Sequence, residues 1–108
     1  MLFRSTPNQS AAHSGPVALW LGVGRAALGD HERAEADFAR ALALAERARA
    51  PFWRATTQLE LARMLVERAQ GDDRARAVGL LEAALETAGE RGFAGVERRG
   101  RPLRDQLA

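Results

Sequence analysis

Two stretches of this sequence decide the fold: AEADFARAL at residues 34–42 and AVGLLEAAL at residues 77–85. In both, small and large apolar residues recur at the same four places, 43 residues apart: Ala34, Phe38, Ala41 and Leu42, then Ala77, Leu81, Ala84 and Leu85. Apolar residues at this spacing lie on one face of an α-helix. The pattern therefore predicts two similar amphipathic helices, over residues 31–49 and 74–90.

Each of these helices follows another apolar segment with helical spacing, at residues 17–28 and at about 52–69. Gly29-Asp30 ends the first segment, and Gly71-Asp72-Asp73 ends the second. Glycine commonly terminates a helix, and aspartate commonly caps the start of the next one. The chain is therefore expected to form four helices in two helix–turn–helix pairs. Strand signals, such as sustained alternation of apolar and polar residues, are missing.

The second pair of helices repeats the first, because Leu21-Gly22 recurs as Leu61-Ala62, 40 residues later. A helical hairpin repeated at this interval is typical of a solenoid, in which small residues let helices approach and large ones fill the gaps. We predict an all-α fold of two stacked antiparallel hairpins, a short right-handed α-solenoid fragment. A short C-terminal capping helix from residue 93 to 99 should follow, broken by Gly100 and Pro102.

The first 16 residues are rich in serine, proline, asparagine and glutamine, and they are expected to be a disordered leader. Residues 17–108 would then form the helical domain. The leader lacks the apolar core of a signal peptide, and no apolar run approaches the length that spans a bilayer. The chain also has no cysteine. These features predict a cytoplasmic protein without membrane association.

Catalytic, cofactor and metal sites are not predicted. His13 and His31 have no second histidine at ligand spacing, and no nucleophile is paired with a base. The segment GVGRAA at residues 22–27 fits the dinucleotide-binding pattern G-x-G-x-x-A. That motif needs a strand before it and a second parallel strand after its helix, whereas only helices follow here. We therefore interpret these glycines as helix-packing residues and expect no enzyme.

Three features together resemble the tetratricopeptide-repeat (TPR) family: Leu21-Gly22, the spacing Ala34-x-x-x-Phe38, and Pro51 after the second helix. Ala18 stands where the family carries tryptophan, and Arg25 stands where it carries tyrosine. The resemblance implies a TPR-like binding scaffold rather than a catalyst.

Residues 15–99 also resemble the helical-repeat tail of large actinobacterial regulators. The distinctive stretches are Asp73-Arg74-x-Arg76-Ala77-x-x-Leu80-Leu81 and Arg91-Gly92-Phe93. In such regulators an ATP-binding module precedes the repeats, and some carry a LuxR-type DNA-binding domain or an adenylate-cyclase domain. This resemblance implies a protein–protein interaction scaffold or regulatory segment of a signalling or transcription regulator. Its partner would be a protein, a peptide or the remainder of a larger regulator.

The first helix of each TPR pair usually lines the concave groove, and this analogy gives a candidate partner groove. Its six residues are Leu19, Val23, Thr56, Leu59, Arg63 and Val66. Trp20 and Trp53 could anchor a partner, but core packing is the favoured interpretation. With little more than two repeats, the chain should leave an apolar end near Trp20 and Leu28 uncovered. We therefore expect either self-association into a homo-oligomer or a place in a longer protein.

Nucleic-acid binding is the alternative function. All 16 basic residues are arginine, but the net charge is only +2 because acidic residues are interleaved with them. An arginine-rich C-terminal end comes closest to the basic patch that nucleic-acid binding requires, and it comprises Arg91, Arg98, Arg99, Arg101 and Arg104. A solvent-facing tail is the favoured interpretation of this end, so nucleic acid is the less favoured partner.

Overall fold

The fold is all-α, as predicted. The computed structural model describes residues 7–108, with side chains from residue 16 onward. Five helices follow one another along this part of the chain, and no strand occurs in it: α1 (Pro7–Ala27), α2 (His31–Arg47), α3 (Pro51–Arg68), α4 (Asp73–Arg91) and α5 (Ala94–Leu107). The bounds of α2, α3 and α4 lie within two residues of the predicted ones.

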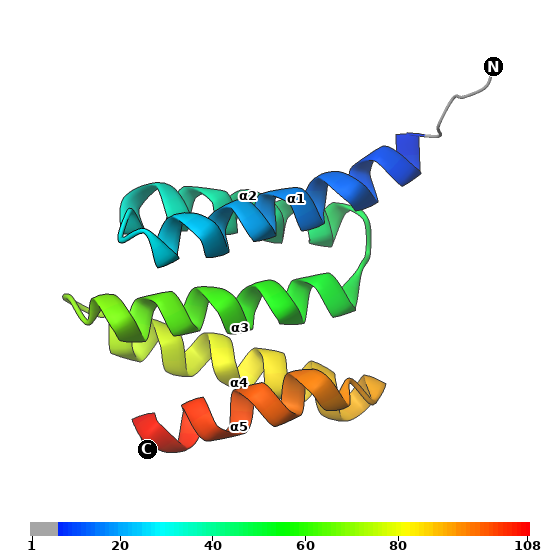
Figure 1. The fold of residues 1–108 in the computed structure, drawn as a ribbon. Coiled ribbons are helices and arrows are strands. Elements are labelled where there is room, and N and C mark those ends of the chain that lie inside the picture. The colour runs from blue at the N-terminus through cyan, green and yellow to red at the C-terminus, as the bar shows by residue number, and fades with distance from the viewer. Residues whose placement is uncertain (1–6) are drawn as a thin grey trace.

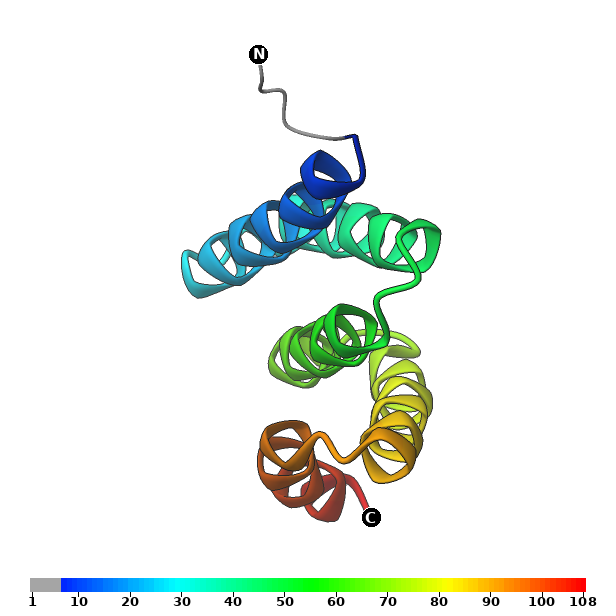
Figure 2. The same cartoon turned by 90° about the vertical axis from the view of Figure 1, so that its right-hand side faces the viewer.

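Consecutive helices run in opposite directions (Figure 1). α1 packs against α2 and α3 packs against α4, so the chain forms two antiparallel hairpins. The hairpins meet where α2 packs against α3, and α5 covers α4 and part of α3. Figure 2 shows the resulting order, with the first hairpin at one end of the molecule and α5 at the other.

The repeated small and large positions form the core. Ala34, Phe38 and Ala41 of α2 are buried, and so are their counterparts 43 residues later in α4, while Leu42 and Leu85 are partly buried. Close helix packing requires the small residues, as Gly22 of α1 shows by its position directly against Phe38. The prediction that tiny and bulky side chains alternate to let paired helices nest is confirmed.

Each turn between helices contains a residue with positive φ. Gly29 (φ +83°) and Gly92 (φ +76°) end α1 and α4 in the left-handed conformation that glycine adopts without strain. Asp30 then caps α2, because its side chain accepts a hydrogen bond from the backbone N–H of Arg33 at 3.4 Å. The other two turns place Arg49 and Ala69 in the same conformation, each at φ +53°.

The prediction of a disordered leader over residues 1–16 is wrong for residues 7–16, which form the first half of α1. Residues 1–6 lie outside the described part of the chain. Proline suits the first turn of a helix, and Pro7 begins α1. The following sequence contains Ala11 and Ala12, and alanine has the highest helix propensity. Pro16, expected to start the helix, lies inside it.

The expected break in the C-terminal helix is also wrong, because α5 continues through Gly100 and Pro102 to Leu107. Gly100 is buried, and a Cβ atom there would lie 3.0 Å from Cδ2 of Leu85 on α4. The glycine therefore permits close packing of α5 on α4 instead of ending the helix. Packing of the apolar side of α5 outweighs the low helix propensity of these two residues.

Four charged side chains tie the two hairpins together at one end of the molecule. Arg68 of α3 donates two hydrogen bonds to Asp73 of α4, at 2.7 and 2.9 Å, and a third to Glu35 of α2 at 3.1 Å. Arg76 of α4 also pairs with Glu35. The hydrogen bonds from Arg68 are the main cause that lowers the pKa of Asp73 from 3.8 to about 2, and the bond from Arg76 lowers the pKa of Glu35. The cluster is therefore charged at neutral pH.

Candidate functional site

The predicted partner groove is largely wrong, because half of its residues lie in the core. Leu19 of α1 and Leu59 of α3 are fully buried, and Thr56 of α3 is buried as well. These side chains face the neighbouring helices, so a partner cannot reach them in this fold. The TPR analogy assigned these three positions to an accessible face, whereas they lie on buried ones.

The other three groove residues remain accessible but do not share one groove. Val23 of α1 and Arg63 of α3 line the same cavity of 140 Å³, where the two first helices of the hairpins meet. Val66 instead lines a separate cavity of 200 Å³ with Arg74 and Leu107. A continuous concave groove through all six predicted residues is therefore not formed.

Four of the five exposed large apolar side chains in the described part of the chain lie on α1 or in the turn directly after it. They are Val17, exposed by 58%, Trp20 by 53%, Leu21 by 44% and Leu28 by 85%. Together with Gly24, they fall within about 100° of one helical face, and we call these five residues the α1 stripe. The uncovered apolar end that the sequence predicted is confirmed. The prediction that Trp20 packs in the core is wrong, because its side chain is more than half exposed. Trp53 is partly buried against the core, as predicted.

The second hairpin buries the equivalent positions. Residues 40 places after Val17, Trp20, Leu21 and Gly24 are Thr57, Glu60, Leu61 and Met64, which are exposed by only 1%, 9%, 5% and 1%. They are covered because α3 has the first hairpin on one side and α5 on the other. Among the helices that the structure describes, none covers the α1 stripe, whereas its counterpart in α3 lies between the first hairpin and α5.

The arginine-rich C-terminal end is partly neutralised by carboxylates. Arg99 donates a hydrogen bond to Glu60 at 2.8 Å, and Arg101 donates one to Glu97 at 3.2 Å. These carboxylates neutralise two of the five arginines and hold their side chains on the protein. Sequence reasoning could not identify these pairs, because Glu60 lies 39 residues before Arg99.

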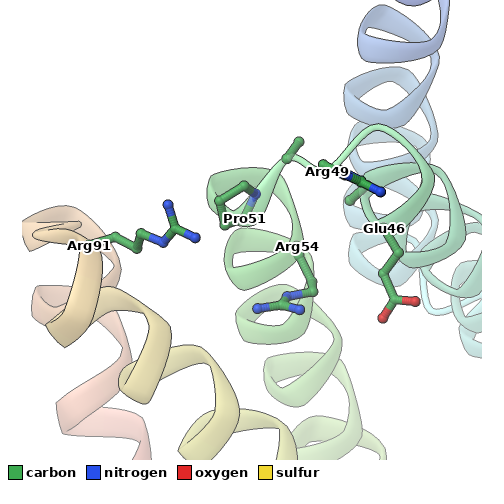
Figure 3. A pocket seen from close by; sticks show the side chains of 7 residues that line it. Glu46, Arg49, Pro51, Arg54 and Arg91 are labelled. Carbon is green, nitrogen blue, oxygen red and sulfur yellow. The ribbon is translucent and has the colours of Figure 1, made fainter.

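Arg91, the first arginine of that end, instead lines a cavity of 480 Å³ where the turn between α2 and α3 approaches the end of α4. Arg49, Arg54 and Arg91 contribute to its wall, together with Glu46 and Pro51. Figure 3 shows Arg91 extending from α4 toward Pro51 and Arg54 beside α3, with Arg49 and Glu46 on the α2 side. We call this cavity the arginine pocket. Sequence reasoning missed it, because its residues come from three separate helix ends.

The features that suggested a metal or dinucleotide site can be placed in the fold. No group of three metal-binding side chains occurs within the described part of the chain, and His31 lies in the first turn of α2. The GVGRAA segment is part of α1 rather than a strand–helix turn. None of the helices that the structure describes is long and apolar enough to cross a membrane.

Comparisons with protein-family models, with curated proteins and with solved structures found no match to this chain. The resemblance to tetratricopeptide repeats therefore stays a prediction.

Proposed function

We propose that this chain is a TPR-like α-solenoid fragment that serves as a protein–protein interaction scaffold, and that the α1 stripe binds a helical segment of its partner. The observation that carries this proposal is the difference between the two repeats. The same positions are buried in α3 and exposed in α1. A partner helix on α1 would supply the cover that the first hairpin supplies to α3.

The chemistry of the α1 stripe favours a helix as the partner. From Val17 to Leu28, the residue directly after the end of α1, the stripe extends about 16 Å, or three helical turns. Gly24 lies between Trp20 and Leu28, and a Cβ atom added there would meet nothing within 4 Å. The bare backbone lets another helix approach closely, while Trp20 offers the kind of large side chain that dominates binding energy at interfaces.

The stripe differs from its counterpart in having no charged or hydroxyl-bearing side chain. In α3, Thr57 bonds to the carbonyl of Trp53 at 2.7 Å, and Glu60 accepts a hydrogen bond from Arg99. The α1 stripe contains only large hydrophobic side chains and a glycine, and its one hydrogen-bonding side-chain group is the indole N–H of Trp20. Burial of such a surface is driven by the hydrophobic effect.

A different protein suits the stripe better than a row of identical chains. In a head-to-tail row, the outer face of α5 would lie on the α1 stripe of the next copy. That face carries the exposed side chains of Arg98, Arg101 and Arg104. Burying guanidinium groups against an apolar stripe without acceptors is unfavourable.

The regulatory setting rests on the resemblance to actinobacterial regulators, and we propose it on that ground. In this setting the scaffold positions a signalling or transcription protein and does no chemistry itself. Binding through the α1 stripe should depend weakly on salt, because no ion pair is involved. Nucleic-acid binding would weaken steeply between low and moderate salt, so a salt titration distinguishes the two functions.

The proposal is tested by site-specific photo-crosslinking in the source cells. A photoreactive residue at Leu21 should capture one partner protein, whereas the same residue at Glu82, exposed on α4, should not. Binding of the purified partner should then be lost in Trp20→Ser and retained in Glu82→Ser. Equal capture at both positions, or binding that survives Trp20→Ser, would contradict the proposal. Sedimentation that shows a dimer dependent on Trp20 would assign the stripe to a second copy instead.

A further inference from the structure

The arginine pocket concentrates positive charge that the rest of the protein does not neutralise. Three arginines and one glutamate line it, which gives its wall a net charge of +2. Arg49, Arg54 and Arg91 form no ion pair with any other residue whose side chain the structure describes. Elsewhere most arginines that contact a neighbouring helix do so through a carboxylate, as Arg25 does with Asp37 at 3.0 Å.

The side chain of Arg54 is held in place but incompletely bonded. Its Nη2 atom donates a hydrogen bond to Oγ1 of Thr87 on α4 at 3.3 Å. Its Nε atom is buried and has no hydrogen-bond partner among the described residues. The bond to Thr87 fixes a guanidinium that lines the pocket, so this guanidinium is preorganised to bind an acceptor there.

The start of α3 places the positive end of a helix dipole beside the pocket, although neither residue there has a free backbone donor. Ala50 donates its N–H to the carbonyl of Ala45 at 2.9 Å, and Pro51 has no N–H. Ala50 occupies the N-cap position of α3 and offers no side-chain acceptor, whereas Asp30 caps α2. Ala50 and Pro51 both line the pocket. The first N–H groups of a helix without a capping side chain favour a negative charge nearby.

We propose that the arginine pocket binds a small oxyanion ligand through its phosphate or carboxylate groups. Guanidinium groups bind both kinds of oxyanion with paired, charge-assisted hydrogen bonds. The net charge of the wall suits a ligand with two negative charges. The volume of 480 Å³ exceeds that of a single ion and falls in the range of small-molecule sites.

The backbone of Arg49 makes a sharp test possible. Arg49 adopts φ +53°, and the equivalent position 43 residues later is Gly92, which has φ +76°. An arginine in this conformation is strained relative to glycine. The variant Arg49→Gly should therefore fold at least as stably as the wild type while it loses one guanidinium from the pocket.

The experiment measures binding of inorganic phosphate, and separately of succinate, at constant ionic strength with chloride as the reference. The Nε–Hε signals of the arginines in NMR spectra report binding directly. We expect saturable shifts of the Arg54 and Arg91 signals. Affinity should fall roughly tenfold in Arg49→Gly and in Arg91→Gln, because each removes a charge-assisted contact. Arg47→Gln, an exposed residue near the end of α2 that does not line the pocket, should bind as the wild type does.

Each outcome bears on the proposal. Tighter binding of phosphate than of succinate assigns the pocket to phosphorylated ligands, and the reverse order assigns it to dicarboxylates. Shifts of equal size at all arginines, or an affinity unchanged in both Arg49→Gly and Arg91→Gln, would overturn the proposal. The Arg49→Gly variant is expected to keep its fold, and its thermal unfolding checks this, so loss of binding in it can be separated from unfolding.

Discussion

Phe38 of α2 packs directly against the backbone of Gly22 in α1. A Cβ atom at position 22 would lie 2.7 Å from Cε1 and 2.8 Å from Cδ1 of the Phe38 ring, closer than such atoms can approach without movement. The ring is buried, so it has little room to shift. The contact sets how closely α1 and α2 approach each other, and it depends on the absence of a side chain at position 22.

Alanine substitutions at two neighbouring glycines of α1 should have opposite effects. Gly24→Ala should raise the free energy of unfolding by about 0.5–1 kcal/mol, because alanine favours the helix and its Cβ atom meets nothing there. Gly22→Ala gains the same propensity but clashes with Phe38, so it should be less stable than Gly24→Ala by about 1–3 kcal/mol. Urea unfolding measures both values. Similar stability of the two variants would show that α1 and α2 can separate at no cost.

The exposure of the α1 stripe in solution can be tested by truncating the equivalent leucine in each hairpin. Leu61→Ala should cost about 2–5 kcal/mol, because it removes a buried side chain from the core. Leu21→Ala, at the equivalent position in α1, should cost about 1 kcal/mol or less, because that side chain is partly exposed to water already. Thermal and urea unfolding of both variants make the comparison. A large loss for Leu21→Ala would mean that α1 is already covered in solution.

The charged cluster between the hairpins should make stability depend on pH in the acid range. Hydrogen bonds from Arg68 lower the pKa of Asp73 from 3.8 to about 2, so the folded state favours the carboxylate. This contribution is complete above pH 3.8 and is lost as the pH falls toward 2. Asp73→Asn should lower Tm at pH 7 and weaken the fall of Tm over this range. Measurements of Tm against pH for both proteins test this, with Asp72→Asn as the exposed neighbouring control.

The end of α3 offers a stabilising substitution. Ala69 has φ +53°, whereas Gly29, the equivalent residue 40 places earlier, has φ +83° without strain. Ala69→Gly should therefore raise the free energy of unfolding by about 1 kcal/mol. Chemical denaturation measures the gain, and Ala39→Gly, at an exposed interior position of α2, should instead lose about 1 kcal/mol. A loss at both positions would show that Ala69 is not strained.

The repeated pattern of small and large residues was sufficient to predict the hairpins. Ala34 and Phe38 share a face by helical geometry alone, and the glycine–aspartate turn at Gly29-Asp30 marks where one helix ends and the next begins. These signals are local, so the sequence carries them without reference to the rest of the fold. The second half of α5 was missed because its helix depends on packing of Gly100 against Leu85, which no local pattern reveals.

The functional surfaces were less predictable, because they depend on which face of each helix meets a neighbour. The sequence placed Leu19 and Leu59 on the correct helices but could not orient them, and both are buried. It did predict that an apolar end near Trp20 would lack cover, since that conclusion follows from the number of repeats. The arginine pocket joins residues from three helix ends, and only the fold brings Arg49 and Arg91 together.

The junction between the two hairpins also determines how the molecule can deform. α2 and α3 pack on each other less extensively than the helices within either hairpin do, and only residues 48–50 connect them. We expect the contact between α2 and α3 to open under an applied force before the helices within either hairpin separate. Force applied to the two ends of the chain should therefore first separate the two hairpins while both remain helical. Unfolding within the hairpins would be the second step.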